Sequence, residues 1–191
     1  MGGQRPREGR CAVNSLLKKT LKEAQFFDWF ERRQGGALPD AETRERLANA
    51  DLLVLGAMSD ELRRSELGDE VRVFANVSAP SDARTVEVPK AATGLEFLRA
   101  VALARICSAP GTHVRIDWSK VGLELAQVAL GFGANELVGD IANKRGLPIA
   151  EDETKKVKGQ GMVDVRSLKK KELATLLSYS GRTAVFQGES S

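Results

Sequence analysis

The strongest constraint on the fold is an alternation between two hydrophobic periods along residues 50–186. Apolar side chains recur at helical spacing over residues 52–62, whereas every second residue of 71–77 is Val or Ala. The same exchange recurs further on, because helix-like segments precede the strand-like segments 113–117 and 183–186. Strands that alternate with helices along a chain are the signature of an α/β fold.

Capping residues mark where several of these helices begin and end. Asp40 is expected to cap a short helix that runs to about residue 49, and Gly68 is expected to end the helix over residues 52–67. Thr93 and Glu96 have the spacing of a capping box, in which each side chain accepts from a free backbone amide of the other residue. A buried helix should follow them.

The later elements carry similar signals. A short strand is expected at residues 84–88. Ser119 is the expected cap of a helix that ends before Gly133, and Ser167 is the expected cap of the last helix, which Gly181 terminates.

The N-terminal part differs from this pattern. Residues 1–13 are rich in Gly, Arg and Pro and are expected to form a disordered tail, as a charged, glycine-containing stretch at 143–165 is expected to form a mobile surface loop. Residues 14–37 are predicted to form one amphipathic helix, capped by Asn14 or Ser15, and residues 38–191 to form the α/β domain.

An aromatic cluster lies near the end of the predicted N-terminal helix. Its members are Phe26, Phe27, Trp29 and Phe30. The cluster could be a partner-binding arm or could pack on the body of the protein, and packing is the favoured interpretation. Deletion of residues 1–36 would separate these readings.

Composition excludes several classes of function. Apolar residues make up 42% and charged residues 29% of the 191 residues, which is typical of a chain that folds, and no apolar run is long enough to span a bilayer. The net charge of +3 comes with short lysine clusters that have no interleaved aromatic residues, which disfavours nucleic-acid binding. The two cysteines have no motif spacing and no signal-peptide pattern is present, so a cytoplasmic protein is expected.

Four segments, at residues 50–77, 93–105, 118–136 and 168–182, carry a family resemblance. They include Thr-Gly-Leu-Glu-Phe-Leu-Arg at 93–99 and Gly-Phe-Gly-Ala-Asn-Glu at 131–136. In this order they resemble radical-SAM enzymes of menaquinone biosynthesis by the futalosine pathway, of the dehypoxanthine futalosine cyclase kind. The resemblance implies a partial, truncated TIM-barrel-like β/α fold with an added N-terminal helix.

The chain departs from that family where the chemistry would take place. The family's first strand is followed by three cysteines at CxxxCxxC spacing, which hold a [4Fe–4S] cluster and leave one iron open. Here residues 76–82 read Asn-Val-Ser-Ala-Pro-Ser-Asp, and Cys11 and Cys107 are the two cysteines of the sequence. The central barrel strands also have no counterpart. No cofactor, metal site or catalytic residue is therefore expected.

The resemblance also suggests residues near a ligand pocket. Trp118, Asn135, Glu136 and Asp140 correspond to positions near a strand end that opens toward the family's substrate, where Trp118 could stack on a nucleoside base. A core role explains Trp118 slightly better, and helix termination explains Asn135 equally well. His113, the single histidine, is expected to have a structural or surface role.

These features predict a non-catalytic relative of a radical-SAM enzyme that acts as a protein-binding, scaffold or regulatory module. Because a partial barrel exposes strand edges, a homodimer or another protein chain is the expected partner. The alternative is a nucleoside-like small-molecule binding protein or small enzyme, with a remnant pocket near Trp118 and Asn135.

Overall fold

The computed structural model describes residues 15–75, 77–80, 82–141 and 169–188. The expected N-terminal tail, the expected loop at 143–165 and the expected caps Asn14 and Ser167 lie outside the described residues. The helices are α1 (Ser15–Glu23), α2 (Phe27–Gln34), α3 (Ala41–Ala48), α4 (Leu52–Leu67), α5 (Gly94–Cys107), α6 (Trp118–Val121), α7 (Leu123–Ala129), the 3₁₀ helix η1 (Leu130–Phe132) and α8 (Lys170–Tyr179). The strands are β1 (Glu70–Ala75), β2 (Thr85–Glu87), β3 (His113–Asp117), β4 (Glu136–Gly139) and β5 (Thr183–Phe186).

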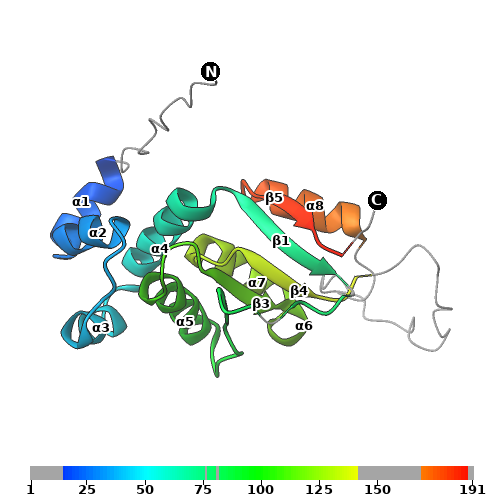
Figure 1. Cartoon of the computed structure of the whole chain (residues 1–191), viewed down its shortest axis with the longest axis horizontal. Coiled ribbons are helices and arrows are strands. Elements are labelled where there is room, and N and C mark those ends of the chain that lie inside the picture. The colour runs from blue at the N-terminus through cyan, green and yellow to red at the C-terminus, as the bar shows by residue number, and fades with distance from the viewer. Residues whose placement is uncertain (1–14, 76, 81, 142–168, 189–191) are drawn as a thin grey trace, which may run out of the picture.

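The five strands form one parallel sheet in the order β2-β3-β4-β1-β5. The register pairs Arg72 of β1 with Glu136 of β4, and Arg115 of β3 with the same Glu136. Helices α1, α2 and α3 lie at one end of the molecule, and α8 with β5 lies toward the other (Figure 1). The expectation of an α/β fold is confirmed.

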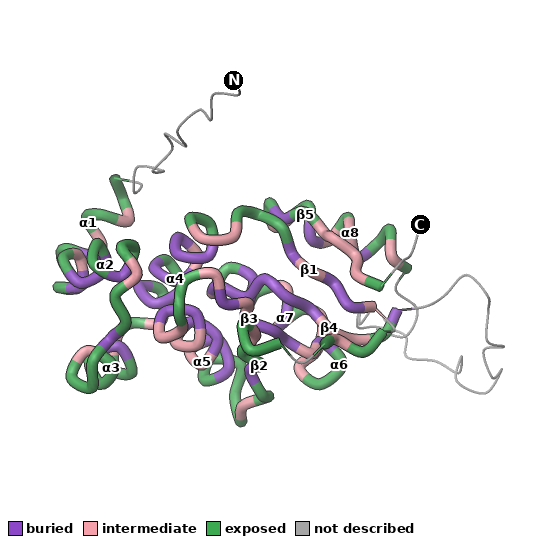
Figure 2. Tube along the Cα trace, in the orientation of Figure 1, coloured by how far each residue is buried: buried purple, intermediate pink, exposed green. Residues whose placement is uncertain are grey.

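The core lies on one face of the sheet. Successive residues of a strand point to opposite faces, so Val71 and Val73 share a face with Ile116 and Leu137 in neighbouring strands. These side chains are fully buried and pack with apolar residues of α5, α7 and α8, such as Val101. Figure 2 shows this burial along β1, β3 and β4.

Most predicted boundaries agree with the structure. The Asp40 carboxylate accepts from Thr43 N at 2.8 Å, and the Thr93–Glu96 capping box is formed with distances of 3.2 and 3.0 Å. The expectation for the helix after β3 is wrong in detail. Asp117, rather than Ser119, is its cap, and Gly122 at φ +89° divides it into α6 and α7.

Strand β4 was not expected from the sequence. Its four residues, Glu-Leu-Val-Gly, contain one charged residue and end in glycine, so they carry no clear period. Even so, β4 lies between β3 and β1 in the sheet. Pairing to both neighbours, rather than local propensity, determines this strand.

The N-terminal segment forms two helices instead of the single helix predicted over residues 14–37. The break is at Gln25, which has a left-handed φ of +58°. The reversal lets α2 fold back, so that Phe26, Trp29 and Phe30 become buried in a second core with Leu55 and residues of α5. Phe27 is half-buried beneath two lysines of α1. The aromatic cluster therefore packs on the body of the protein and does not form an exposed arm.

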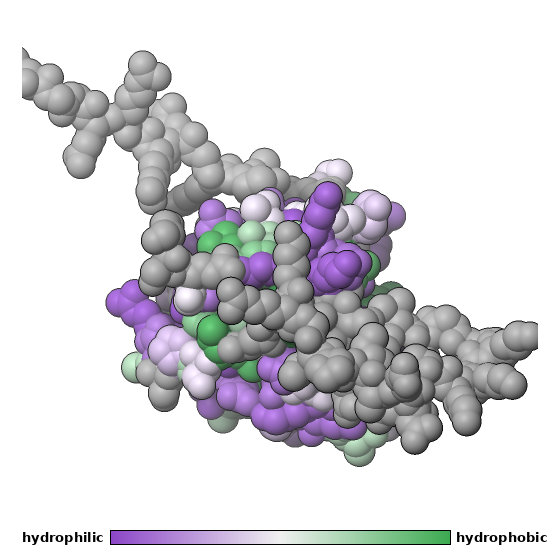
Figure 3. Space-filling view, turned by 90° about the vertical axis from the view of Figure 1, so that its right-hand side faces the viewer, coloured by the Kyte–Doolittle hydropathy of each residue, from purple (hydrophilic) through white to green (hydrophobic). Residues whose placement is uncertain are grey.

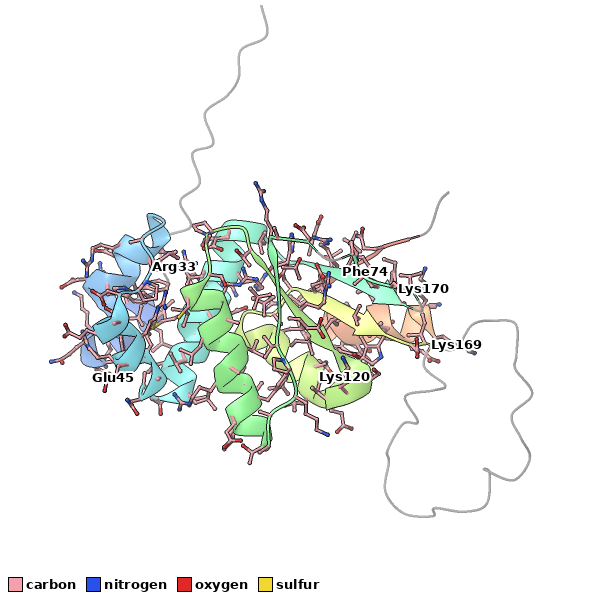
Figure 4. All side chains as sticks on the ribbon, turned by 60° about the horizontal axis from the view of Figure 1, so that its bottom comes forward. Arg33, Glu45, Phe74, Lys120, Lys169 and Lys170 are labelled. Carbon is pink, nitrogen blue, oxygen red and sulfur yellow. The ribbon has the colours of Figure 1, made fainter. Side chains whose placement is uncertain are left out.

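One arginine joins these N-terminal helices to the α/β body. Arg33 of α2 is fully buried, and its guanidinium donates to the carbonyl oxygens of Ile106 and Ser108, each at 2.8 Å. A third donor reaches the carboxylate of Glu66 in α4 at 3.0 Å. Arg33 thus satisfies carbonyls that the end of α5 leaves free, at the junction seen in Figure 4.

We expect Arg33→Met to lower the free energy of unfolding by about 3 kcal/mol, because it leaves the carbonyl oxygens at the end of α5 and Oε1 of Glu66 without their donor. Chemical denaturation measures this change. Arg32→Met, at an exposed position of the same helix, is the matched control and should change stability by less than about 0.5 kcal/mol. Equal effects of the two substitutions would contradict the role given to Arg33.

Candidate functional site

The face of the sheet opposite the core carries a cluster of charged residues around one aromatic ring. Arg72 and Phe74 of β1, Arg115 of β3 and Glu136 of β4 point to this side, because they alternate with the core residues. None of these four residues belongs to the two core clusters of the described residues. We call them the charged face.

Glu136 is at the centre of the charged face. Its side chain is fully buried and forms an ion pair with Arg115, and its Oε2 lies 3.4 Å from Nε of Arg72. Both guanidinium groups also lie over the ring of Phe74, with Cζ at 5.4 and 5.6 Å from its centroid. The Glu136 carboxylate of β4 is therefore linked by charge to an arginine of each neighbouring strand, β1 and β3.

The described segment after β1 crosses this side of the sheet. Arg115 Nη2 donates to the Pro80 carbonyl oxygen at 2.9 Å, and Phe74 and Arg115 are nearly buried. Two buried oxygens on this side, Oε2 of Glu136 and Oγ1 of Thr85, make no hydrogen bond in the described part of the chain. The charged face is thus an enclosed polar layer rather than an apolar core.

A second polar network holds the end of the sheet where the strands begin. Asn135 Oδ1 accepts from Arg105 Nη2 at 2.7 Å and from the Val114 amide at 3.0 Å, and its Nδ2 lies 2.7 Å from Nδ1 of His113. Arg105 also donates to the carbonyl oxygens of Gly133 and Thr112. Burial lowers the pKa of Arg105 to about 10, against the opposing effect of Glu66.

The structure separates the four residues predicted to line a pocket. Asn135 and Glu136 lie at the beginning of β4, whereas Asp140 follows its end and Trp118 follows the end of β3. The expectation that they share one strand end is therefore wrong. The side-chain oxygen of Asn135 already accepts two hydrogen bonds, and the side chain of Glu136 is fully buried beside Arg115, so neither side chain is open to a ligand.

Trp118 is a core residue. It is fully buried, its Nε1 donates to the Asp140 carbonyl oxygen at 3.3 Å, and its ring lies against Gly139. A Cβ atom at residue 139 would lie 2.4 Å from this ring, so the glycine provides the space that Trp118 fills. Base stacking on Trp118 would require the ring to leave the core.

The end of the sheet toward which the strands point has a charged group of its own. Asp117 Oδ2 lies 3.0 Å from Lys120 Nζ, which is also 3.6 Å from Glu87 of β2. Although burial acts to raise it, hydrogen bonds from Ser119 and Lys120 hold the pKa of Asp117 below its ordinary value. The coloured surface seen at this end is mainly hydrophilic, with hydrophobic side chains visible at several separate places (Figure 3).

Sequence reasoning missed Arg72, Phe74 and Arg115. Their signal was present, because each of the two arginines lies between core residues that are valine or isoleucine. A solvent-facing side would explain arginine at such positions equally well. Only the pairing of both strands with β4 brings the arginines to Glu136.

Comparisons with known proteins add no family to this description: no protein-family model, no curated protein and no solved structure matches the chain. Among the described residues, His, Cys, Asp and Glu form no group of three or more that could hold a metal ion. Over the same residues, no helix has both the length and the apolar character to cross a membrane.

We expect Trp118→Ala to lower the free energy of unfolding by about 3–5 kcal/mol, because it removes a large, fully buried side chain. Thermal and urea denaturation measure the loss. Tyr179→Ala, which truncates an aromatic side chain that is 80% exposed, is the control and should be nearly neutral. A stable Trp118→Ala protein would show that this side chain is not needed for packing.

The stability of the protein should fall as the pH decreases below about 6.5. Burial, followed by the charge of Arg72, lowers the pKa of His113 from its ordinary value of 6.5. The unfolded chain therefore takes up a proton at His113 before the folded protein does, so its contribution is complete above pH 6.5 and is lost as the pH falls through the folded pKa. Urea unfolding at pH 5–8 measures this slope.

His113→Gln is the control for this pH dependence. It keeps a polar side chain beside Asn135 but cannot be protonated, so its stability should change less with pH over the same range. Identical slopes for both proteins would assign the pH dependence to other groups.

Proposed function

We propose that this chain is a non-catalytic, cytoplasmic binding module related to radical-SAM barrel enzymes, and that it acts as a homo-oligomer. The observation that carries the proposal is a parallel sheet whose described helices build an apolar core on one face. Within the described residues, no further strand pairs with either of its edge strands. All-parallel sheets are almost always covered on both faces or closed into barrels. The outer edges of β2 and β5 are therefore the places where a strand of a partner can add to this sheet.

The strand order supports the proposed barrel ancestry. Strand β1 lies in the segment that resembles the family's first barrel strand. Strand β3 lies between the segments at 93–105 and 118–136, which resemble the family's late part, and β4 begins where the second of them ends. In a closed barrel the last strand lies beside the first. Here the last two described strands, β4 and β5, both lie parallel beside β1, as expected if the ends of a barrel were joined and its middle strands were lost.

The positions of the cysteines support a role without redox chemistry. The segment after β1, where the family holds its cluster, contains no cysteine. Cys107 ends α5, which precedes β3 and so lies toward the opposite end of the sheet, and burial raises the pKa of its thiol. A raised pKa disfavours the thiolate that binds iron.

The alternative, a nucleoside-like pocket near Trp118 and Asn135, gains no support from the geometry. Both side chains are buried, and each is engaged by residues of its own chain at opposite ends of β4. A shallow hollow of about 430 Å³ does exist between the α1–α2 turn and α3, beside Phe26 and Arg46. It lies on the N-terminal helices and has no relation to the predicted pocket.

Native mass spectrometry of the full chain at micromolar concentration tests the proposal, because one spectrum reports subunit number, bound metal and retained small molecules. We expect the mass of a homo-oligomer, most simply a dimer, without iron or a nucleoside. A strict monomer would remove the self-association, and a monomer that retained a nucleoside would favour the alternative function.

A further inference from the structure

We propose that two copies of this chain pair edge to edge, β2 of each copy with β5 of the other, so that their sheets close into one parallel barrel. The inference rests on the proposed homo-oligomer and adds its geometry. The partner is a second copy, and the contact consists of two free strand edges that complement each other.

At the outer edge of β2, the backbone amide and carbonyl of Glu87 are the groups that point away from the sheet. In a parallel ladder, alternate residues bond to the same neighbouring strand. The Arg84 carbonyl oxygen accepts from His113 N at 2.7 Å and Val88 N donates to the Arg115 carbonyl oxygen at 3.0 Å, so residues 84, 86 and 88 face β3. The amide and carbonyl of Glu87 consequently point away from the sheet.

The outer edge of β5 presents the complementary set. Thr183 N donates to the Asp69 carbonyl oxygen at 3.0 Å and Gln187 N donates to the Val73 carbonyl oxygen at 2.8 Å, so residues 183, 185 and 187 face β1. The backbone groups of Ala184 and Phe186 therefore point outward. No strand of the described chain lies beyond β5 or β2.

The positions of these two edges allow two copies related by a twofold rotation to close into a barrel. They are opposite edges of one parallel sheet, so a copy turned by half a rotation about an axis along the strands presents its β5 to β2, parallel and with the helix sides continuous. Val86, which is 37% exposed, lies on the helix side of β2, and Ala184 and Phe186 lie half-buried on the helix side of β5. Apolar side chains thus meet one another on that side.

Charge at the two edges is also complementary. Glu87 is the last residue of β2 and is exposed. The lysines that begin α8 lie at the matching end of β5, because Lys170 Nζ is 4.6 Å from the centroid of the Phe186 ring (Figure 4). Its neighbours Lys169 and Lys171 are exposed. Parallel pairing would bring this basic group to Glu87, which Lys120 of its own chain also approaches at 3.6 Å.

Closure would place the charged face, which the segment after β1 already covers in each copy, inside the barrel. The barrel interior would enclose two copies of the Arg72–Glu136–Arg115 cluster, while the helices that cover the core remain outside. Parallel barrels have this arrangement, with helices forming an outer ring around the strands. The sheet of each copy, with its apolar core on the outer face, then forms half of the barrel wall.

Thiol cross-linking tests the pairing directly. In a Cys11→Ser, Cys107→Ala background, one chain carries Val86→Cys and another carries Ala184→Cys, and the two are co-expressed with different affinity tags. A short bis-maleimide should yield a covalent dimer in the co-purified pair but not in either variant alone. Cross-linking of Val86→Cys alone would instead assign a β2–β2 contact. Absence of cross-links in a pair that remains dimeric would overturn the edge pairing and leave the homo-oligomer intact.

A proline at the free edge provides a second test. Glu87→Pro removes the outward amide without affecting the ladder to β3, whereas Glu87→Ala keeps that amide and removes the charge. We expect the dimer Kd to rise at least roughly tenfold for Glu87→Pro relative to Glu87→Ala, since each closed dimer loses two hydrogen bonds. Equal Kd values, measured by sedimentation with both variants folded by circular dichroism, would contradict the proposal.

Discussion

The rest of the structure depends on the pairing of β4 with its two neighbours. Without β4, the sheet would separate into β2–β3 and β1–β5. The same four residues supply Leu137 to the apolar core, Glu136 to the charged face and Gly139 to the space occupied by Trp118. Side chains on both faces of the sheet therefore require this short strand to be in its observed register.

Buried arginines hold the elements around that sheet. Arg33 closes the end of α5, Arg105 joins α5 to the turn before β4, and Arg182 pairs with Asp60 at 2.6 Å to tie β5 to α4. Burying a guanidinium is costly unless its donors are matched, and the donors of Arg33 and Arg105 meet carbonyl or carboxylate oxygens. In Arg182, Nη1 and Nη2 are matched, whereas its buried Nε makes no hydrogen bond in the described part of the chain. The N-terminal helices are consequently part of the fold rather than an attached arm.

The sequence predicted the elements that have a regular period or a cap, such as α5 with its Thr93–Glu96 box and β3 with its alternating residues. It did not predict β4, the break at Gln25 or the division between α6 and α7, because these follow from tertiary pairing and from single backbone conformations. The charged face escaped prediction for the same reason. Arg72, Arg115 and Glu136 are distant in sequence and meet only through the strand order.

The central claim is that both edges of the parallel sheet, which has its apolar core on one face, are used for self-association. Residue-resolved hydrogen exchange of the Glu87, Ala184 and Phe186 amides, measured over a range of protein concentrations, tests it most directly. The account predicts that these amides become protected as concentration rises, while the β4 amides stay protected throughout. Rapid exchange at the edge amides at every concentration, with β4 still protected, would show that the edges remain free and would contradict it.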